Sequence, residues 1–123
     1  IYCNQVEYHP FLSQEILLRK MNEIGVIPVA YCPLCRGDVT KDSVIIELSK
    51  KYNKTPSQVT LRWIIQQNAV VIPKSAKKRR LKENIDIYDF EIDNQDMDRI
   101  HGLARGQRLV PNSDTNPFLG AWD

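Results

Sequence analysis

The chain has 123 residues, of which 42% are hydrophobic and 26% charged, and its formal net charge is +2. This composition excludes disordered and low-complexity proteins, and the balanced charge gives no support for a nucleic-acid or membrane partner. Three cysteines are too few for a disulfide scaffold, and no apolar stretch approaches the roughly 20 residues of a membrane span. We therefore expect a cytoplasmic protein. Because Ile1 already lies inside a strand-like stretch, we also expect the sequence to be part of a longer chain.

The first part of the chain alternates between strand and helix patterns. Residues 1–7 predict a strand. A helix follows, with its N-cap at Ser13 and its end at Gly25, a residue that easily adopts the left-handed conformation of a helix stop. Its apolar face, at helical spacing, is formed by Leu17, Leu18, Met21 and Ile24. Residues 26–31 are an almost continuous apolar run, which is typical of a parallel strand buried on both faces.

The middle of the chain predicts a loop and two helices. Residues 32–42 hold a proline, a glycine and two acidic residues and predict a loop. Asp42 predicts the cap of a helix that ends near Asn53. Thr55 and Pro56, with a glutamine three residues after the threonine, are a strong signal for the start of the next helix.

The last part predicts one more strand and two helices. Residues 69–72 form a short apolar strand, residues 74–84 a short basic helix, and residues 93–106 a helix whose inward face is Met97, Ile100 and Ala104. Residues 107–123 form an irregular C-terminal tail. Helical stretches of this length are the crossovers that consecutive parallel strands need. The fold class is therefore α/β with a parallel sheet, and residues 1–123 form a single domain or part of one.

A basic cluster follows the third strand and is the first candidate site. Its members are Lys74, Lys77, Lys78, Arg79, Arg80 and Lys82. A solvated helix face, a nucleic-acid patch and an anion site are all open interpretations of such a charge run. Position favours the anion site, because Lys74 and Ser75 follow a strand and precede a helix, where α/β folds bind ligands and free N–H groups attract phosphate. We therefore expect a phosphate-bearing ligand.

Other candidates lie near the ends of the first two strands. Cys32 and Cys35 form a C-x-x-C pattern that allows a thiol–disulfide role, although the loop after it lacks the helix start that lowers a thiol pKa. Tyr31 ends a buried strand, and its ring could stack on a ligand ring. Gln5 could form hydrogen bonds with a ligand's amide. Core packing and local hydrogen bonding remain the alternatives for both. We expect no metal site.

Three motifs together resemble the aldo-keto reductases. They are Asn4-Gln5-Val6-Glu7-Tyr8-His9-Pro10, then Ala30-Tyr31-Cys32-Pro33-Leu34, then Ile72-Pro73-Lys74-Ser75 followed by Arg80, Glu83 and Asn84. Members of that family are (β/α)₈ TIM barrels that use NADPH, or sometimes NADH, to reduce aldehydes and ketones to alcohols. The resemblance implies that this chain corresponds to about strands six to eight, the C-terminal portion of such a barrel.

The resemblance implies a cofactor role for each matched residue. Gln5 would contact the nicotinamide carboxamide, and Tyr31 would stack on the nicotinamide ring. The pyrophosphate would lie along Cys32, Pro33 and Leu34. The remaining matches would hold the adenosine 2′-phosphate and the adenine, and they are Lys74, Ser75, Ala76, Arg80, Glu83 and Asn84. Two cations beside the extra phosphate favour NADP(H) over NAD(H).

The family's catalytic Asp, Tyr, Lys and His motifs have no match here, so we expect no catalytic residue in this segment and no activity from it alone. The resemblance implies that the complete enzyme is a monomer or weak oligomer acting on a small carbonyl substrate, with Phe118 and Trp122 beside the substrate pocket. A non-catalytic nucleotide- or partner-binding half-barrel remains an alternative, as does a thiol–disulfide protein. A bare half-barrel would expose sheet edges and would be expected to dimerise or to dissolve poorly.

Overall fold

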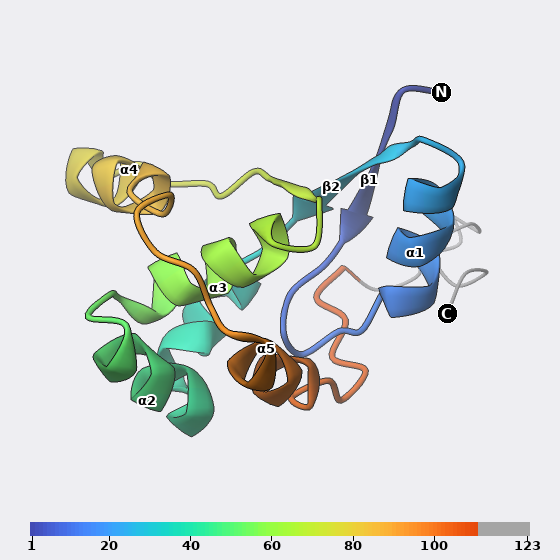
Figure 1. Cartoon of the computed structure of the whole chain (residues 1–123). Coiled ribbons are helices and arrows are strands. Elements are labelled where there is room, and N and C mark those ends of the chain that lie inside the picture. Colours follow the sequence, from blue (N-terminus) through green and yellow to red (C-terminus); the bar gives the residue numbers. More distant parts are fainter. Residues whose placement is uncertain (111–123) are drawn as a thin grey trace.

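Three parallel strands form the sheet of this protein, whose computed structural model describes residues 1–110 (Figure 1). The strands are β1 (Cys3–Glu7), β2 (Ile27–Tyr31) and β3 (Val70–Val71), and they lie side by side in that order. Gln5 is paired with Val29, which is paired in turn with Val70. The predicted α/β class with a parallel sheet is therefore confirmed, although β3 is shorter than the predicted strand.

Helices connect and follow the strands. They are α1 (Glu15–Glu23), the 3₁₀ segment η1 (Cys35–Lys41), α2 (Ser43–Lys51), α3 (Pro56–Ile65), α4 (Lys78–Ile85) and α5 (Asn94–His101). α3 contacts α2, β3 and α4, and α2 contacts α5. Figure 1 shows α1 and α4 on opposite sides of the molecule, with α3 between them. No helix within residues 1–110 has the length and hydrophobicity needed to cross a bilayer.

Local capping chemistry sets where α2 and α3 begin. The Asp42 carboxylate accepts hydrogen bonds from the backbone N–H groups of the first turn of α2. Thr55 and Gln58 form a reciprocal capping box at the start of α3, with Pro56 at the first helical position. Both predicted helix starts are confirmed, because these bonds involve only residues close together in the sequence.

Three helix boundaries differ from the prediction, and one of them is the start of α4, which lies at Lys78 instead of residue 74. Ser13 does not cap α1; the N-cap is Gln14, whose side chain instead donates to the buried backbone oxygen of Glu7. The last helix ends at His101 instead of continuing to residue 106, and Ala104 is exposed. The backbone N–H of Arg105 donates to the backbone oxygen of Phe11. This tertiary hydrogen bond replaces the one that would continue the helix.

The two faces of the sheet have different surroundings. Val6, Ala30 and Val71 pack against the core formed by the helices, with Trp63 and Ile64 among its members. Side chains alternate along a strand, so Gln5, Val29 and Val70 lie on the other face. That second face, here called the open face, also carries Ile27 and Ile72, which are 36% and 43% exposed.

Candidate functional site

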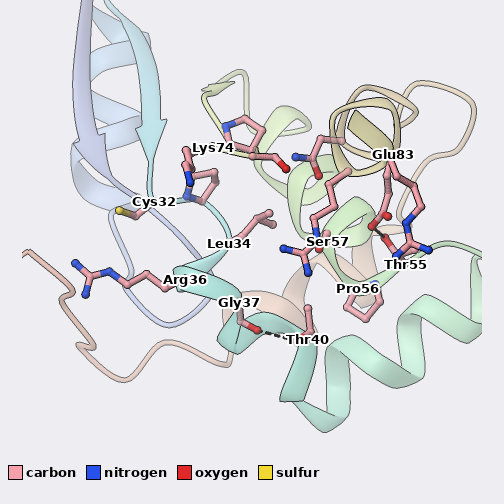
Figure 2. A pocket seen from close by; sticks show the side chains of 16 residues that line it. Cys32, Leu34, Arg36, Gly37, Thr40, Thr55, Pro56, Ser57, Lys74 and Glu83 are labelled. Atoms are coloured by element: carbon pink, nitrogen blue, oxygen red, sulfur yellow. Dashed lines mark hydrogen bonds between the residues drawn. The ribbon is translucent and has the colours of Figure 1, made fainter. Parts of the chain in front are cut away.

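A pocket of about 620 Å³ lies where three segments distant in the sequence meet (Figure 2). The loop after β2, the start of α3 and the β3–α4 connection form its walls. Eight of the eleven residues predicted to bind a cofactor line it, and they are Cys32, Pro33, Leu34, Lys74, Ser75, Arg80, Glu83 and Asn84. The structure thus brings the second and third sequence motifs together around one cavity.

The electrostatics of the pocket favour an anion. Lys74, Arg79 and Arg80 line it, and none of the three forms an ion pair within residues 1–110. The one carboxylate in the lining belongs to Glu83. Cations that have no carboxylate partner remain available for the charge-assisted hydrogen bonds that hold phosphate groups.

The β3–α4 connection adds backbone donors to these cations. Ser75 Oγ accepts a hydrogen bond from the backbone N–H of Lys77 at 3.1 Å, which turns the chain into α4. The following backbone N–H groups, in the first turn of α4, have no partner inside the helix. Lys74 and Ser75 therefore stand between the end of a parallel strand and a helix start, as the sequence predicted.

Several pocket residues were missed by sequence reasoning. They are Arg36, Gly37 and Thr40 from η1 and Thr55, Pro56 and Ser57 from the start of α3. Pro73 and Arg79 also line the pocket, and they belong to the third sequence motif and to the predicted basic cluster. In Figure 2 the side chains of Ser57 and Thr55 lie near Glu83, whereas Arg36 extends away from them. One signal could have found the α3 group: a helix that leads into a parallel strand runs antiparallel to it, and so begins at the carboxyl edge of the sheet.

Gln5, Tyr31 and Ala76 do not line this pocket. Gln5 and Tyr31 share the open face of the sheet, because Gln5 is two residues from Glu7, which is paired with Tyr31. Burial raises the pKa of the Tyr31 hydroxyl, and Glu7 adds to that shift. Ala76 is exposed in the β3–α4 connection. Apart from Ala76, the predicted cofactor residues therefore form a pocket group and an open-face group.

The C-x-x-C pair has no activated thiol. Burial raises the pKa of Cys32, and it raises the pKa of Cys35 to about 11. Cys35 is fully buried, where the Gln107 side chain donates to its sulfur. A redox-active cysteine needs a lowered pKa and access to solvent, so the geometry does not support the thiol–disulfide alternative.

Glu7 and His9, which sequence reasoning left without a role, form a buried pair at the end of β1. His9 Nε2 lies 3.1 Å from Glu7 Oε1. The Glu7 carboxylate also accepts the backbone N–H groups of Leu109 and Val110, and so fixes the segment that leads into the tail. These acceptors and donors are about 100 residues apart, so no local pattern signals the contact. The predicted substrate-pocket aromatics, Phe118 and Trp122, lie outside the described residues.

Comparison with known proteins identifies one family. The model of the Aldo/keto reductase family matches residues 1–105. Glyoxal reductase of Bacillus subtilis (strain 168) is 42% identical over 111 residues, which are 90% of this chain and 40% of that protein. An aldo-keto reductase of Mycolicibacterium smegmatis is 40% identical over 117 residues, 95% of this chain and 42% of the relative.

Solved structures agree with the sequence comparison. A putative 2,5-diketo-D-gluconic acid reductase B superposes with a TM-score of 0.90 at 36% identity, covering 98% of this chain and 43% of that one. A variant of Gox0644 in complex with NADPH has a TM-score of 0.84 at 34% identity, with coverage of 89% and 41%. This chain thus spans less than half the length of each of these relatives.

Proposed function

Because this chain belongs to the aldo/keto reductase family, we propose that it is the cofactor-binding part of an NADPH-dependent reductase of small carbonyl compounds. In the complete enzyme it would contribute about strands six to eight of a (β/α)₈ barrel. The observation that carries the proposal is the pocket in which Lys74, Arg79 and Arg80 have no carboxylate partners within the described residues. A solved relative in complex with NADPH supports the choice of cofactor.

The residues of the pocket fit the phosphate end of such a cofactor. Lys74 supplies a point charge, Arg80 a forked one, and Ser75 a hydroxyl at the entrance of α4. An NADPH molecule carries one more phosphate than NADH, and that dianion would lie against these side chains. Glu83 and Asn84, on the same helix, would contact the adenine. We therefore infer a preference for NADPH.

The open-face residues fit the nicotinamide end. Tyr31 would stack on the ring and Gln5 would bind its carboxamide, at the carboxyl ends of the strands where barrel enzymes bind their ligands. NADPH, when bound, supplies the hydride that reduces a carbonyl carbon. The residues of this chain bind and orient the cofactor. The family's catalytic Asp, Tyr, Lys and His are proposed to belong to the rest of the enzyme.

The proposal predicts that Lys74→Met weakens NADPH binding about tenfold while changing NADH binding less, because only NADPH places a phosphate against Lys74. Nucleotide fluorescence titration of the wild-type and variant chains measures both affinities. Lys20→Met is the matched control, since Lys20 lies on α1 and pairs only with its neighbour Glu23 within the described residues. Equal losses for NADPH and NADH, or no NADPH binding by the wild-type chain, would contradict the proposal.

A non-catalytic nucleotide-binding role is the competing function, and turnover separates the two. In both cases the 123-residue chain binds NADPH without reducing a carbonyl substrate. Adding the catalytic part of the enzyme restores NADPH oxidation only if this chain belongs to a reductase. Saturable turnover by the 123-residue chain alone would show that our assignment of the catalytic residues is wrong.

A further inference from the structure

Helix α4 carries four residues of the pocket but is not held in place by its own apolar side chains. Arg79, Arg80, Glu83 and Asn84 line the pocket, yet no residue of α4 is buried. Its apolar residues Leu81 and Ile85 are 50% and 71% exposed. Hydrophobic packing therefore cannot by itself fix the side chains of α4 relative to a ligand.

Polar contacts from the start of α3 hold the C-terminal half of α4 instead. The Thr55 hydroxyl donates to Glu83 Oε1 at 2.7 Å. Gln58 Nε2 donates to the backbone oxygens of Glu83 and Asp86, at 3.2 and 2.9 Å. Beyond the helix, Lys54 pairs with Asp86 and Asp89, and buried Ile87 anchors the chain in the core. Of these contacts, only the Thr55 bond acts on a side chain that lines the pocket.

Thr55 has a second role that fixes the direction of its hydroxyl proton. Its Oγ1 accepts the backbone N–H of Gln58 at 3.3 Å, as the N-cap of α3, while Gln58 Oε1 accepts the backbone N–H of Thr55 at 3.0 Å. A hydroxyl has a single proton, and here that proton goes to Glu83. The capping box of α3 and the orientation of the Glu83 carboxylate are therefore one connected network.

This network leaves one carboxylate oxygen for a ligand. Glu83 Oε1 is occupied by Thr55, whereas no hydrogen bond or ion pair to Oε2 is found within residues 1–110. An ionised carboxylate only accepts hydrogen bonds. Oε2 is thus suited to a ligand N–H donor, such as an exocyclic amine, and is poorly suited to a carbonyl oxygen at the same position.

We propose that Thr55 is a positioning residue for ligand specificity: by holding Glu83 Oε1 it presents Oε2 to the exocyclic amine of a purine, and so makes the pocket select adenine over a purine with a carbonyl at that position. The proposal rests on the nucleotide-binding function above and extends it to a residue that does not contact the amine itself. The Thr55 hydroxyl thus has two roles that can be tested separately: it caps α3 and it orients the Glu83 carboxylate.

Three substitutions of Thr55 separate these roles. Thr55→Ser keeps both the cap and the hydroxyl proton. Thr55→Asp keeps a good helix cap but has no proton to donate and repels Glu83. Thr55→Val removes both. Asp42→Ala is the control, because it removes the cap of α2 and leaves Glu83 untouched. Circular dichroism establishes that each variant is folded before binding is measured.

The measurement is the ratio of the dissociation constants for NADPH and its deamino analogue, in which hypoxanthine replaces adenine. We expect the wild-type chain, Thr55→Ser and Asp42→Ala to prefer NADPH about tenfold, the value of one hydrogen bond to a charged group. We expect the ratio to fall to about one in Thr55→Asp and Thr55→Val. The Asp variant keeps the helix cap, so it tests the proposal even if the Val variant does not fold.

Other outcomes overturn the proposal in distinguishable ways. An unchanged preference in folded Thr55→Asp shows that Glu83 does not need Thr55. Equal weakening of both nucleotides, with the ratio preserved, shows a purely structural cap. A wild-type chain that binds both nucleotides equally well shows that Glu83 does not read the amine, whereas one that binds neither contradicts the proposed function itself.

Discussion

The buried pair of Glu7 and His9 links the stability of this chain to pH. His9 is fully buried, its Nε2 faces the Glu7 carboxylate, and its Nδ1 has no hydrogen-bond partner within the described residues. Protonation would place an N–H group without an acceptor in the interior, and burial accordingly lowers the pKa of His9 below 6.5. Glu7 opposes this shift, but burial is the larger effect.

The sign of the pH dependence follows from that lowered pKa. Around and below pH 6.5 the unfolded chain binds more protons at His9 than the folded chain does, so the free energy of unfolding falls as the pH decreases. We expect a loss of about 1 kcal/mol between pH 7.5 and pH 5.5, measured by urea denaturation. His9→Gln should remove most of this loss and His101→Gln should keep it. A wild-type stability that does not change over this range would contradict the prediction.

At the scale of elements, Asp96 joins α5 to α2. Asp96 is 3% exposed. Its carboxylate accepts hydrogen bonds from Lys51 Nζ at 2.5 Å, Tyr52 Oη at 2.7 Å and Arg99 at 3.3 Å. These hydrogen bonds lower the pKa of Asp96 against the effect of burial. Donors from the C-terminal end of α2, from its C-cap Tyr52 and from α5 thus converge on one carboxylate.

Removing this carboxylate should weaken the contact between α2 and α5. We expect Asp96→Ala to lower the free energy of unfolding by about 2 kcal/mol, because the Tyr52 hydroxyl loses its acceptor and the half-exposed Lys51 ammonium keeps only its ion pair with Asp93. Asp98→Ala on the exposed side of the same helix should change it by less than about 0.5 kcal/mol. Chemical denaturation measures both, and equal effects would show that Asp96 does not join the helices.

The helix boundaries show which features of the fold a local sequence pattern is sufficient to predict. The starts of α2 and α3 were predictable because Asp42 and Thr55 bond to backbone groups two or three residues away. The start of α1 was not, because Gln14 bonds to Glu7 instead of to its own helix. A competing tertiary hydrogen bond also ends α5 early.

At the scale of the whole molecule, the open face of the sheet is the main uncovered apolar surface of the strands. Ile27, Val70 and Ile72 are all at least 36% exposed on or beside it. In the described sheet β1 and β3 are edge strands, so each also has backbone groups available for pairing with another chain. Both properties favour association of the 123-residue chain when it is alone.

We expect the isolated chain to self-associate with increasing concentration, as measured by sedimentation velocity. Val70→Lys should weaken this association, because it places a charge on the open face and on an edge strand. Ile16→Lys is the control, since Ile16 is 70% exposed on α1, away from the sheet face. A chain that stays monomeric at all concentrations, or equal effects of the two substitutions, would contradict this role of the open face.

The sequence by itself determined the order of the strands and α-helices, the parallel sheet and the family, whereas the 3₁₀ segment η1 lies where it predicted a loop. Strand runs, caps and the motifs around Gln5, Tyr31 and Lys74 depend on residues that are neighbours in the chain, and such interactions can be recognised without a structure. The cofactor roles of these residues remain predictions.

Only the tertiary structure decided how these pieces form a site. It placed the start of α3 in the wall of the pocket, connected Thr55 to Glu83 across 28 residues, and brought Leu109 to the Glu7 carboxylate across 102. The physical reason is that most polar groups in the interior are paired, with partners that the fold supplies. Which partner a group has depends on the packing of distant segments, so it cannot be predicted from a short stretch of sequence.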